Sequence, residues 1–426
     1  MRRIITVASG KGGVGKTTFA INFALALSRI APTVLVDLDT GTSSIRNTLD
    51  LRIERDLYHF FRRDTPLDQC LTTLDSRLDP RGLFRDFALV AAPRHSIEEI
   101  ATMGPRARRR LMEAINGLPG TFTVLDLRAG LDAAVIDFLP LSNSGILVFT
   151  PRHPAATLAA GDIVRSLLFR KLRIVFSENS PLFRGGDGRL QHRLVNDLLD
   201  QVEDVYQEGL PNLDAFLADL RSALGDSPWV EAIEDVIHSF GVFFVLNMFN
   251  GVEESWENAI RPFGTHLRNT ISQRLSMTNL GWIVEDPQVH EANCRRRPIL
   301  LDSGVEEGPP GPLSETRDPV LRELDRLEAD VLGLPSPRDL SPAPRRAARD
   351  EIEELDRDDP LSRQLEVLRR MYSSRGKAQV RDNFAYITRR AHHLLRDLPR
   401  GTFGQPRLVP PEEIQKHVFG GASRSR

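Results

Sequence analysis

A glycine-rich loop between a short apolar run and a longer helix-compatible run is the feature that most constrains the fold. The loop reads GKGGVGKT over Gly10–Thr17, between the apolar run Ile4–Ala8 and the segment Thr17–Ile30. A strand, a glycine loop and a helix in this order form the opening unit of a parallel βαβ sheet. The alternation of short apolar and longer amphipathic runs continues to about residue 300. It predicts an α/β fold with a doubly wound, mostly parallel sheet.

Several runs rich in β-branched and aromatic residues are predicted to be strands. Their lack of strict alternation suits strands that are covered on both faces. The predicted strands are Ile4–Ala8, Thr33–Asp37, Phe87–Ala91, Phe122–Leu127, Gly145–Thr150, Val242–Asn247 and Leu280–Val284. The predicted helices between them include Thr17–Ile30, Ile97–Gly117 and Pro154–Phe169.

The interval Arg170–Phe240 is longer than a plain crossover between neighbouring strands requires. We predict a helical insertion at about residues 177–240, on one edge of the sheet. Its expected helices are Leu190–Glu208, Leu213–Leu224 and Trp229–His238. The alternative is that one or two of these helices belong to the core fold. With the insertion included, the α/β domain is predicted to span residues 1–302.

The composition changes after residue 302. Residues 303–360 read as an acidic, Pro/Gly-rich linker region, and residues 361–426 as a basic helical segment. Within 305–360 there are 8 basic and 16 acidic side chains, net −8; within 361–426 there are 14 and 5, net +9. The chain should therefore carry a mainly helical C-terminal extension. Its positive charge suits weak contact with acidic lipid, with DNA or with the acidic stretch before it.

Composition excludes several classes of protein. The formal net charge of the whole chain is −2, which does not suit a generic nucleic-acid binder. The two cysteines, Cys70 and Cys294, are too few for a disulfide framework or a self-contained iron–sulfur cluster. Each is predicted to be a small buried hydrophobe. Because no apolar run approaches the roughly 18–20 residues that span a bilayer, we expect a cytoplasmic protein, either free or peripheral at the inner face of the membrane.

The glycine loop satisfies the Walker A pattern in the required context of strand, loop and helix. Its backbone N–H groups and the positive end of the following helix form a cradle for phosphate. Lys16 is expected to reach the β- and γ-phosphates of ATP, and the Thr17 hydroxyl to bind Mg²⁺. The predicted nucleotide-binding set in this loop is Gly10, Lys11, Gly12, Gly13, Val14, Gly15, Lys16, Thr17 and Thr18.

Acidic residues end two of the predicted strands. Asp37 and Asp39 close the second strand, and Asp126 closes the strand Phe122–Leu127. In an open α/β sheet, ligands bind at the carboxyl ends of the strands. The sequence therefore predicts a ligand site at this edge, where Thr17 and the Walker B acid Asp126 are expected to contact Mg²⁺, Asp126 through water. The alternative for Asp37 and Asp39 is that they only cap the next helix.

The string KGGVGKTT, from Lys11 to Thr18, resembles the deviant Walker A motif of the MinD/ParA group of P-loop ATPases. That resemblance implies that Lys11 crosses a dimer interface to the phosphates of the other subunit, so that ATP binding and homodimer formation are one event. The D-x-D-x-G form of Asp37–Gly41 is similar to MinD and the flagellar regulator FlhG. That similarity implies that Asp39 positions the attacking water or the Mg²⁺ shell, and that Asp37 supports the metal. Arg128 departs from the small residue of the second switch, where it could speed or slow hydrolysis.

Further matches extend the resemblance over about residues 1–302. Asn247 resembles the strand-ending asparagine that contacts adenine, and Asp286 falls in the adenine-side loop of MinD-like proteins. Phe149–Pro151 resembles the start of the family's T-P-E-P-T segment, with Arg152 and His153 replacing its acidic middle.

The expected function is a slow, partner-stimulated ATPase that acts as a dimerising switch and regulates the position or number of a cellular structure. Its catalytic residues would be Lys11, Lys16 and Asp39, and its regulatory protein partner is unknown. Three other functions remain open. The first is a nucleotide-binding scaffold with little hydrolysis. The second is a ParA-like, DNA-associated partition ATPase, for which the arginines of Arg106–Arg110 are a candidate patch. The third is an ATP-dependent amide-forming synthase of the cobyrinic-acid or dethiobiotin type.

Overall fold

The computed structural model describes most of the first 302 residues and one helix near the C-terminus. The described residues are 3–39, 44–94, 103–140, 143–178, 180–183, 188–203, 212–225, 227–302, 365, 369 and 380–396. The predicted acidic linker, and the predicted basic segment apart from residues 365, 369 and 380–396, lie outside them.

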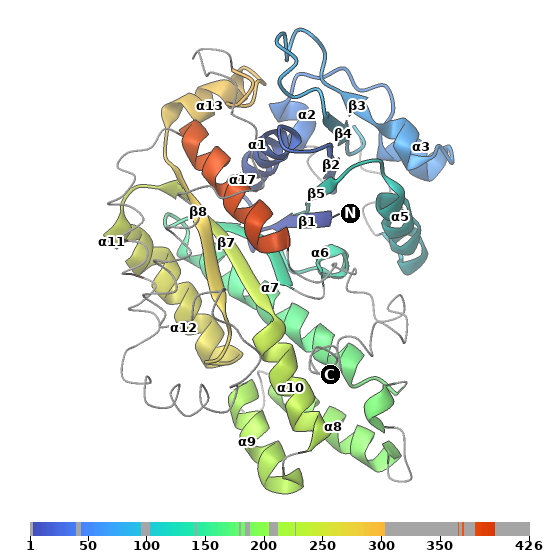
Figure 1. Ribbon diagram of the computed structural model, residues 1–426, viewed down its shortest axis with the longest axis vertical. Helices are drawn as coiled ribbons and strands as arrows, with labels where there is room; N and C mark the ends of the chain where they lie inside the picture. The colour runs from blue at the N-terminus through green and yellow to red at the C-terminus, as the bar shows by residue number, and fades with distance from the viewer. Residues whose placement is uncertain are drawn as a thin grey trace, which may run out of the picture.

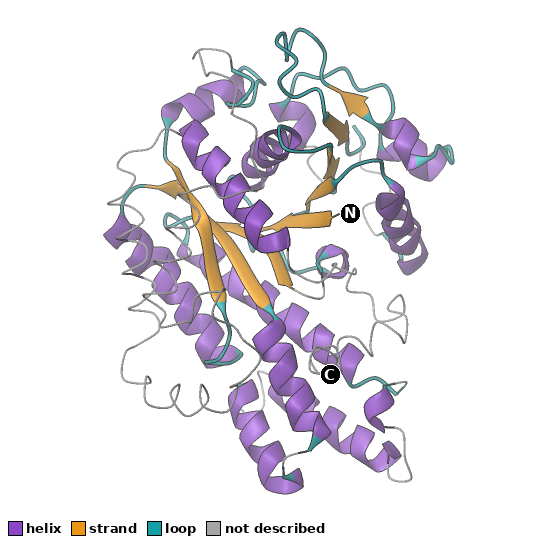
Figure 2. Cartoon of the chain, viewed as in Figure 1, coloured by secondary structure: helices purple, strands orange, loops and turns teal. Residues whose placement is uncertain are grey.

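A single sheet of eight strands forms the centre of the described part (Figures 1 and 2). The strand order is β3-β4-β2-β5-β1-β6-β7-β8, and all neighbours pair in parallel except β3 with β4. The strands are β1 (Arg3–Ala8), β2 (Thr33–Asp37), β3 (Thr72–Thr73), β4 (Phe87–Val90), β5 (Phe122–Asp126), β6 (Asn143–Phe149), β7 (Gly241–Phe249) and β8 (Met277–Val284). The predicted α/β fold and all seven predicted strands are confirmed.

Helices cover both faces of the sheet, as the doubly wound prediction requires. The helices of the described residues are α1 (Lys16–Ser28), α2 (Ser44–Thr48), α3 (Leu57–Arg62), η1 (Leu67–Cys70), α5 (Pro105–Gly117), α6 (Ala133–Phe138), α7 (Pro154–Val175), η2 (Pro181–Phe183), α8 (Gly188–Glu203), α9 (Leu213–Leu224), α10 (Pro228–Ser239), α11 (Val252–Ser255), the π-helical turn η3 (Trp256–Ile260), α12 (Arg261–Thr270), α13 (Pro287–Cys294) and α17 (Val380–Arg396). Of the predicted helix Ile97–Gly117, residues 97–102 lie outside the described residues, and the described part is α5, which begins at Pro105 because Gly104 is extended and proline fits the first helical position.

The three central strands fix the positions of the acidic residues. β2, β5 and β1 are neighbours, and their register sets Asp37 opposite Asp126 and Val7 opposite Asp126. All residues of β2 and β5 are buried. The carboxyl ends of these strands therefore meet at one edge of the sheet, directly below the glycine loop that follows β1.

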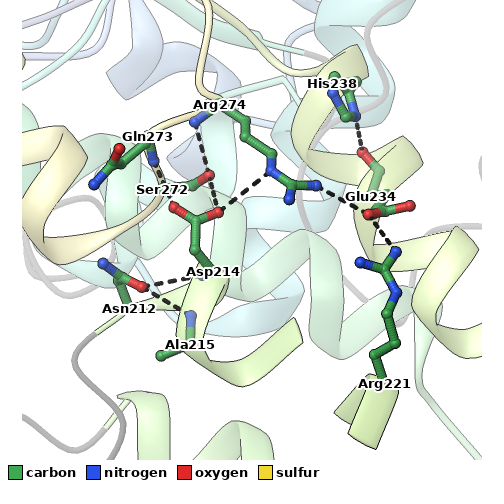
Figure 3. A network of polar contacts seen from close by, with 9 residues as sticks. All are labelled: Asn212, Asp214, Ala215, Arg221, Glu234, His238, Ser272, Gln273 and Arg274. Carbon is green, nitrogen blue, oxygen red and sulfur yellow. Dashed lines mark hydrogen bonds and ion pairs between the residues drawn. The ribbon is translucent and has the colours of Figure 1, made fainter. Parts of the chain in front are cut away.

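The segment that the sequence predicts as an insertion contains α8, α9 and α10, which lie beyond the start of β7 at the lower end of the molecule (Figure 1). Asp214 of α9 accepts hydrogen bonds from the Ser272 hydroxyl at 2.8 Å and the Gln273 N–H at 2.7 Å (Figure 3). These partners belong to the connection between α12 and β8. The insertion is thus attached at the amino ends of the strands, opposite the glycine loop.

A second contact in Figure 3 joins α9 and α10 to the connection between α12 and β8. Glu234 of α10 accepts hydrogen bonds from Arg221 of α9 and from Arg274, both at 2.9 Å. Burial alone would raise the pKa of Glu234, but the two guanidinium groups lower it. The carboxylate therefore stays charged and stabilises the attachment.

The C-terminal helix α17 packs against α1 and β8, and so contributes to the core of the α/β domain (Figure 1). Phe384 is 1% exposed and stacks on Phe19 of α1 with 6.3 Å between ring centroids. A Cβ atom on Gly281 of β8 would lie 2.8 Å from Ile387, so glycine allows the close approach of helix and strand. Asn383 accepts a hydrogen bond from the Val284 N–H at 3.1 Å. Because most of α17 is buried, it is not a surface helix available to lipid or DNA.

The two cysteines differ in environment. Cys70 is buried, as predicted, and burial raises the pKa of its thiol to about 11. The prediction is wrong for Cys294, which is exposed at the end of α13 and lies 3.5 Å from the ring of His290. Among the described helices, none combines the length and apolar character that crossing a bilayer requires.

The packing of α17 gives a direct test of its place in the core. Phe384→Ala should lower the free energy of unfolding by roughly 3–5 kcal/mol, the usual cost of deleting a buried phenylalanine side chain. Urea unfolding followed by circular dichroism measures this difference. Asp382→Asn, an exposed change in the same helix, is the matched control and should cost less than about 1 kcal/mol. Equal stability of Phe384→Ala and the unmodified protein would contradict this packing.

Candidate active site

The glycine loop is held in an open, anion-accepting shape. Gly13 and Gly15 have φ of 83° and 81°, a region that residues with side chains rarely adopt. Gly15 is the N-cap of α1 and provides no side chain to the free N–H groups of the first turn. Those amides are therefore available to a phosphate, with the positive end of the helix behind them.

Asn247 braces this loop from the end of β7. Its side-chain amide donates a hydrogen bond to the Val14 carbonyl at 2.8 Å. A Cβ atom on Gly15 would lie 2.1 Å from the same amide nitrogen, so only glycine fits there. The predicted contact between Asn247 and adenine stays a prediction, but the contact between Asn247 and the loop backbone is direct.

Lys16 lies beneath the loop and pairs with the acid at the end of β5. Its ammonium is 2.5 Å from Asp126 Oδ1, and the two side chains are 6% and 0% exposed. A buried ion pair of this kind has lost its hydration, so it depends on good geometry and on further polar partners. The second oxygen, Asp126 Oδ2, is buried without a hydrogen-bond partner among the described residues.

Asp37 places a second buried carboxyl group beside this pair. Burial, followed by the charge of Asp126, raises the pKa of Asp37 to about 8. Burial also raises the pKa of Asp126, although the charge of Lys16 opposes that effect. Asp37 Oδ1 accepts a hydrogen bond from the Asp39 N–H at 3.1 Å, while Oδ2 is buried with no partner among the described residues. One lysine thus faces two buried carboxyl groups.

These carboxyl oxygens fit a Mg²⁺ ion held together with a nucleotide. Asp37 and Asp126 each present a buried oxygen that still lacks a partner, and Mg²⁺ prefers such hard oxygen ligands. The Thr17 hydroxyl favours the ionised form of Asp126, so it lies on the same side. The described residues contain no group of three or more His, Cys, Asp or Glu side chains able to hold a metal alone. Phosphate oxygens and water would therefore complete the shell, as is usual for Mg²⁺.

The other predicted loop residues separate into exposed and inward-facing ones. Lys11, Gly12 and Gly13 are exposed on the rim of the loop. Thr18 points its hydroxyl to α13, where Asn293 donates a hydrogen bond to it at 3.2 Å. Asp286 caps α13 by accepting a hydrogen bond from the Gln288 N–H at 2.8 Å, and its predicted contact with the nucleotide stays a prediction.

Two features of this edge were not foreseen from the sequence. The Ser9 hydroxyl donates to the Lys11 carbonyl at 3.1 Å and so shapes the entrance of the loop. Arg152, after β6, forms an ion pair with Glu285, after β8. The replacement of an acidic residue by Arg152 was visible in the sequence, but its partner lies 133 positions away.

Comparison with known proteins is consistent with this geometry. The family profile described as "CobQ/CobB/MinD/ParA nucleotide binding domain" matches residues 5–299. The chain is 32% identical over 172 residues to the chloroplastic septum site-determining protein MinD homolog of Arabidopsis thaliana, covering 39% of this chain and 50% of that protein. It is 30% identical over 183 residues to the septum site-determining protein MinD of a Synechocystis species, covering 41% and 66%. The chain thus spans about half to two thirds of the length of these relatives.

One similar solved structure is the septum site-determining protein MinD of Pyrococcus horikoshii, complexed with Mg-ADP. It shares 16% sequence identity with this chain at a TM-score of 0.42, and the match covers 72% of this chain and 90% of that one.

The buried carboxyl group of Asp37 predicts an unusual dependence of stability on pH. Its folded pKa of about 8 lies above the ordinary value of 3.8, so the folded state binds more protons between these values. Stability should therefore fall as the pH rises from about 4 to about 8, and level off above that. Asp37→Asn should remove this loss when neither magnesium nor nucleotide is present. At pH 8.5 its free energy of unfolding should exceed that of the unmodified protein by more than about 1.4 kcal/mol, the equivalent of one pKa unit.

Urea unfolding at pH 5 and pH 8.5 measures the difference. The advantage of Asp37→Asn should be smaller at pH 5 than at pH 8.5, because stability of the unmodified protein keeps falling until the pH reaches the folded pKa of about 8. Glu113→Gln, which changes an exposed carboxylate, is the control and should behave like the unmodified protein at both values. A pH dependence that persists unchanged in Asp37→Asn would contradict the assignment.

Proposed function

Because the chain belongs to the CobQ/CobB/MinD/ParA nucleotide-binding family, we propose that it is an ATP-dependent dimerising switch that hydrolyses ATP slowly. The ATP-bound dimer would be the active state, and it would regulate the position or number of a cellular structure through a protein partner. The observation that carries this proposal is the buried pair of Lys16 and Asp126 beside Asp37. Two carboxyl groups share one lysine, which suits a site built to receive a further cation with its phosphates.

The chain's own residues have distinct roles in this proposal. The loop amides and Lys16 bind the phosphates, and Lys16 exchanges Asp126 for the β- and γ-oxygens. Bound Mg²⁺ would be held by Thr17, Asp37, Asp39 and Asp126, directly or through water, and supplies neutralising charge at the phosphates. Asp39 orients the attacking water.

Hydrolysis then follows in-line geometry. The water oxygen bonds to the γ-phosphorus while the bond from that phosphorus to the β–γ bridging oxygen breaks. The water's proton passes to phosphate. Lys16 and Lys11 of the partner subunit offset the negative charge on these oxygens. The exposed rim position of Lys11 supports its role across a dimer interface.

The arginines of α5 give little support to the DNA-binding alternative. Arg108 pairs with the buried Asp137 at 2.6 Å. Arg110 pairs with Asp64 at 2.8 Å and also donates to the Phe60 carbonyl. Only the exposed Arg106 and Arg109 remain for a basic patch, and Arg109 contacts Glu113 at 2.9 Å. Most of the positive charge of these four neighbouring arginines is therefore balanced by acidic residues of the same chain.

Removing Lys16 tests nucleotide binding. Lys16→Ala should abolish Mg·ATP binding and phosphate release, since the β- and γ-phosphates lose their buried cation. Calorimetric titration and a phosphate-release assay measure the two effects, and a circular dichroism spectrum checks that the variant is folded. Phosphate release that requires a small carboxylic acid and an amine would instead support an amide-forming synthase. Full ATP binding by folded Lys16→Ala would overturn the assignment of the site.

Removing Lys11 separates binding from dimer formation. Lys11→Ala should bind Mg·ATP within a few-fold of the unmodified protein, yet lose the ATP-dependent dimer and the hydrolysis coupled to it. Light scattering with a non-hydrolysable ATP analogue measures the mass, and phosphate release measures turnover. If the unmodified protein stays monomeric with ATP and magnesium at every concentration, or if Lys11→Ala hydrolyses normally, the dimer mechanism is wrong.

A further inference from the structure

Arg128 is a cation near the predicted phosphate site, and none of the roles described above involves it. It lies two residues after Asp126, on the loop between β5 and α6, and its side chain is 53% exposed. Its ion-pair partner is Asp132, at 4.0 Å and 48% exposed. An exposed pair at this distance contributes little to stability. The guanidinium can therefore change partners at small cost.

The pair with Asp132 is not needed to build the local structure. Asp132 caps α6 by accepting a hydrogen bond from the Val135 N–H at 3.0 Å, a contact that does not involve Arg128. Loss of the arginine would leave this cap in place. The contact with Asp132 thus gives Arg128 no structural purpose.

The loop that carries Arg128 is hydrogen-bonded on one side to strand β1 and on the other to the start of the phosphate loop. The Leu127 N–H donates to the Val7 carbonyl at 3.1 Å, and the Gly130 N–H donates to the Ser9 carbonyl at 3.0 Å. Two residues of chain span at most about 7 Å. Arg128 is therefore close to Asp126, whose carboxylate is 2.5 Å from the Lys16 ammonium.

We propose that Arg128 binds the γ-phosphate of ATP held by its own subunit, and so lets the chain distinguish ATP from ADP. This inference rests on the proposed function. A guanidinium presents two parallel N–H donors that match two phosphate oxygens, and charge-assisted bonds of this kind are strong. Lys16 lies under the loop and reaches the β-phosphate, which both nucleotides carry, as well as the γ-phosphate. Arg128 meets only the γ-phosphate, which ADP lacks. Asp132 remains solvated when Arg128 leaves it.

The experiment compares binding of Mg·ADP with that of Mg·AMPPNP, a non-hydrolysable triphosphate, by calorimetric titration. Arg128→Ala should weaken AMPPNP binding about tenfold to a hundredfold, the range for lost bonds to a charged group, and leave ADP binding within about twofold. The affinity of Arg128→Lys for AMPPNP should lie between those of the unmodified protein and Arg128→Ala, because lysine keeps the charge but lacks the two parallel N–H donors of the guanidinium. Arg109→Ala is the matched control: it removes an exposed arginine with an i,i+4 acidic partner on α5, and should change neither affinity.

Repeating the titrations in the Lys11→Ala background tests whether Arg128 acts within its own subunit. The effect of Arg128→Ala should persist there, where dimer formation is removed. Its disappearance would show action across the interface and overturn the inference.

The remaining outcomes separate this inference from the proposed function. Equal losses for ADP and AMPPNP would mean that Arg128 shapes the loop rather than binds the γ-phosphate, and unchanged affinities would remove it from the site. Either result overturns the inference and leaves the proposed function intact. Failure of the unmodified protein to bind either nucleotide would overturn the proposed function itself.

Discussion

The contact between Lys16 and Asp126 is the interaction on which the arrangement of the site depends. It joins the first residue of α1 to the last residue of β5 inside the protein, where the two side chains are 6% and 0% exposed. Asp37 adds a second carboxyl group that the single lysine does not neutralise. In a low-dielectric interior such an imbalance raises carboxyl pKa values. A ligand that brings its own cation balances the second carboxylate, and the same two carboxyl groups then help to hold that cation.

The sheet order makes this convergence unavoidable. β1 lies between β5 and β6, and β2 lies beyond β5. The loop after β1 and the acids that end β2 and β5 must therefore share one edge, because all three strands run parallel. Asn247, at the end of β7, reaches the loop from the other side. The loop is thus shaped by contacts from distant parts of the chain rather than by its glycines alone.

This dependence on distant contacts explains what could be predicted from the sequence. The strands and the phosphate loop were predictable because apolar runs and glycine spacing are local signals, and the acids could be assigned to the edge because each ends a strand. β3 was missed because two residues carry no periodicity. The pairing of Arg152 with Glu285 and of Asn293 with Thr18 depends on residues far apart in the sequence. The packing of α17 was hidden in the same way: its amphipathic pattern predicted a helix but not that its apolar face meets α1 and β8.

The position of the insertion limits how it can act on the site. α8, α9 and α10 lie at the amino ends of the strands, so they cannot touch a nucleotide at the opposite edge. α7 spans the distance: its 22 residues extend about 33 Å at 1.5 Å per residue. Near its start, Ala159 packs so closely on the phosphate loop that a Cβ atom on Gly10 would lie 2.5 Å away. Near its end, Lys171 donates to Ser239 of α10, and Arg173 pairs with Glu203 of α8. One continuous helix therefore contacts the phosphate loop near its start and the helices α8 and α10 near its end.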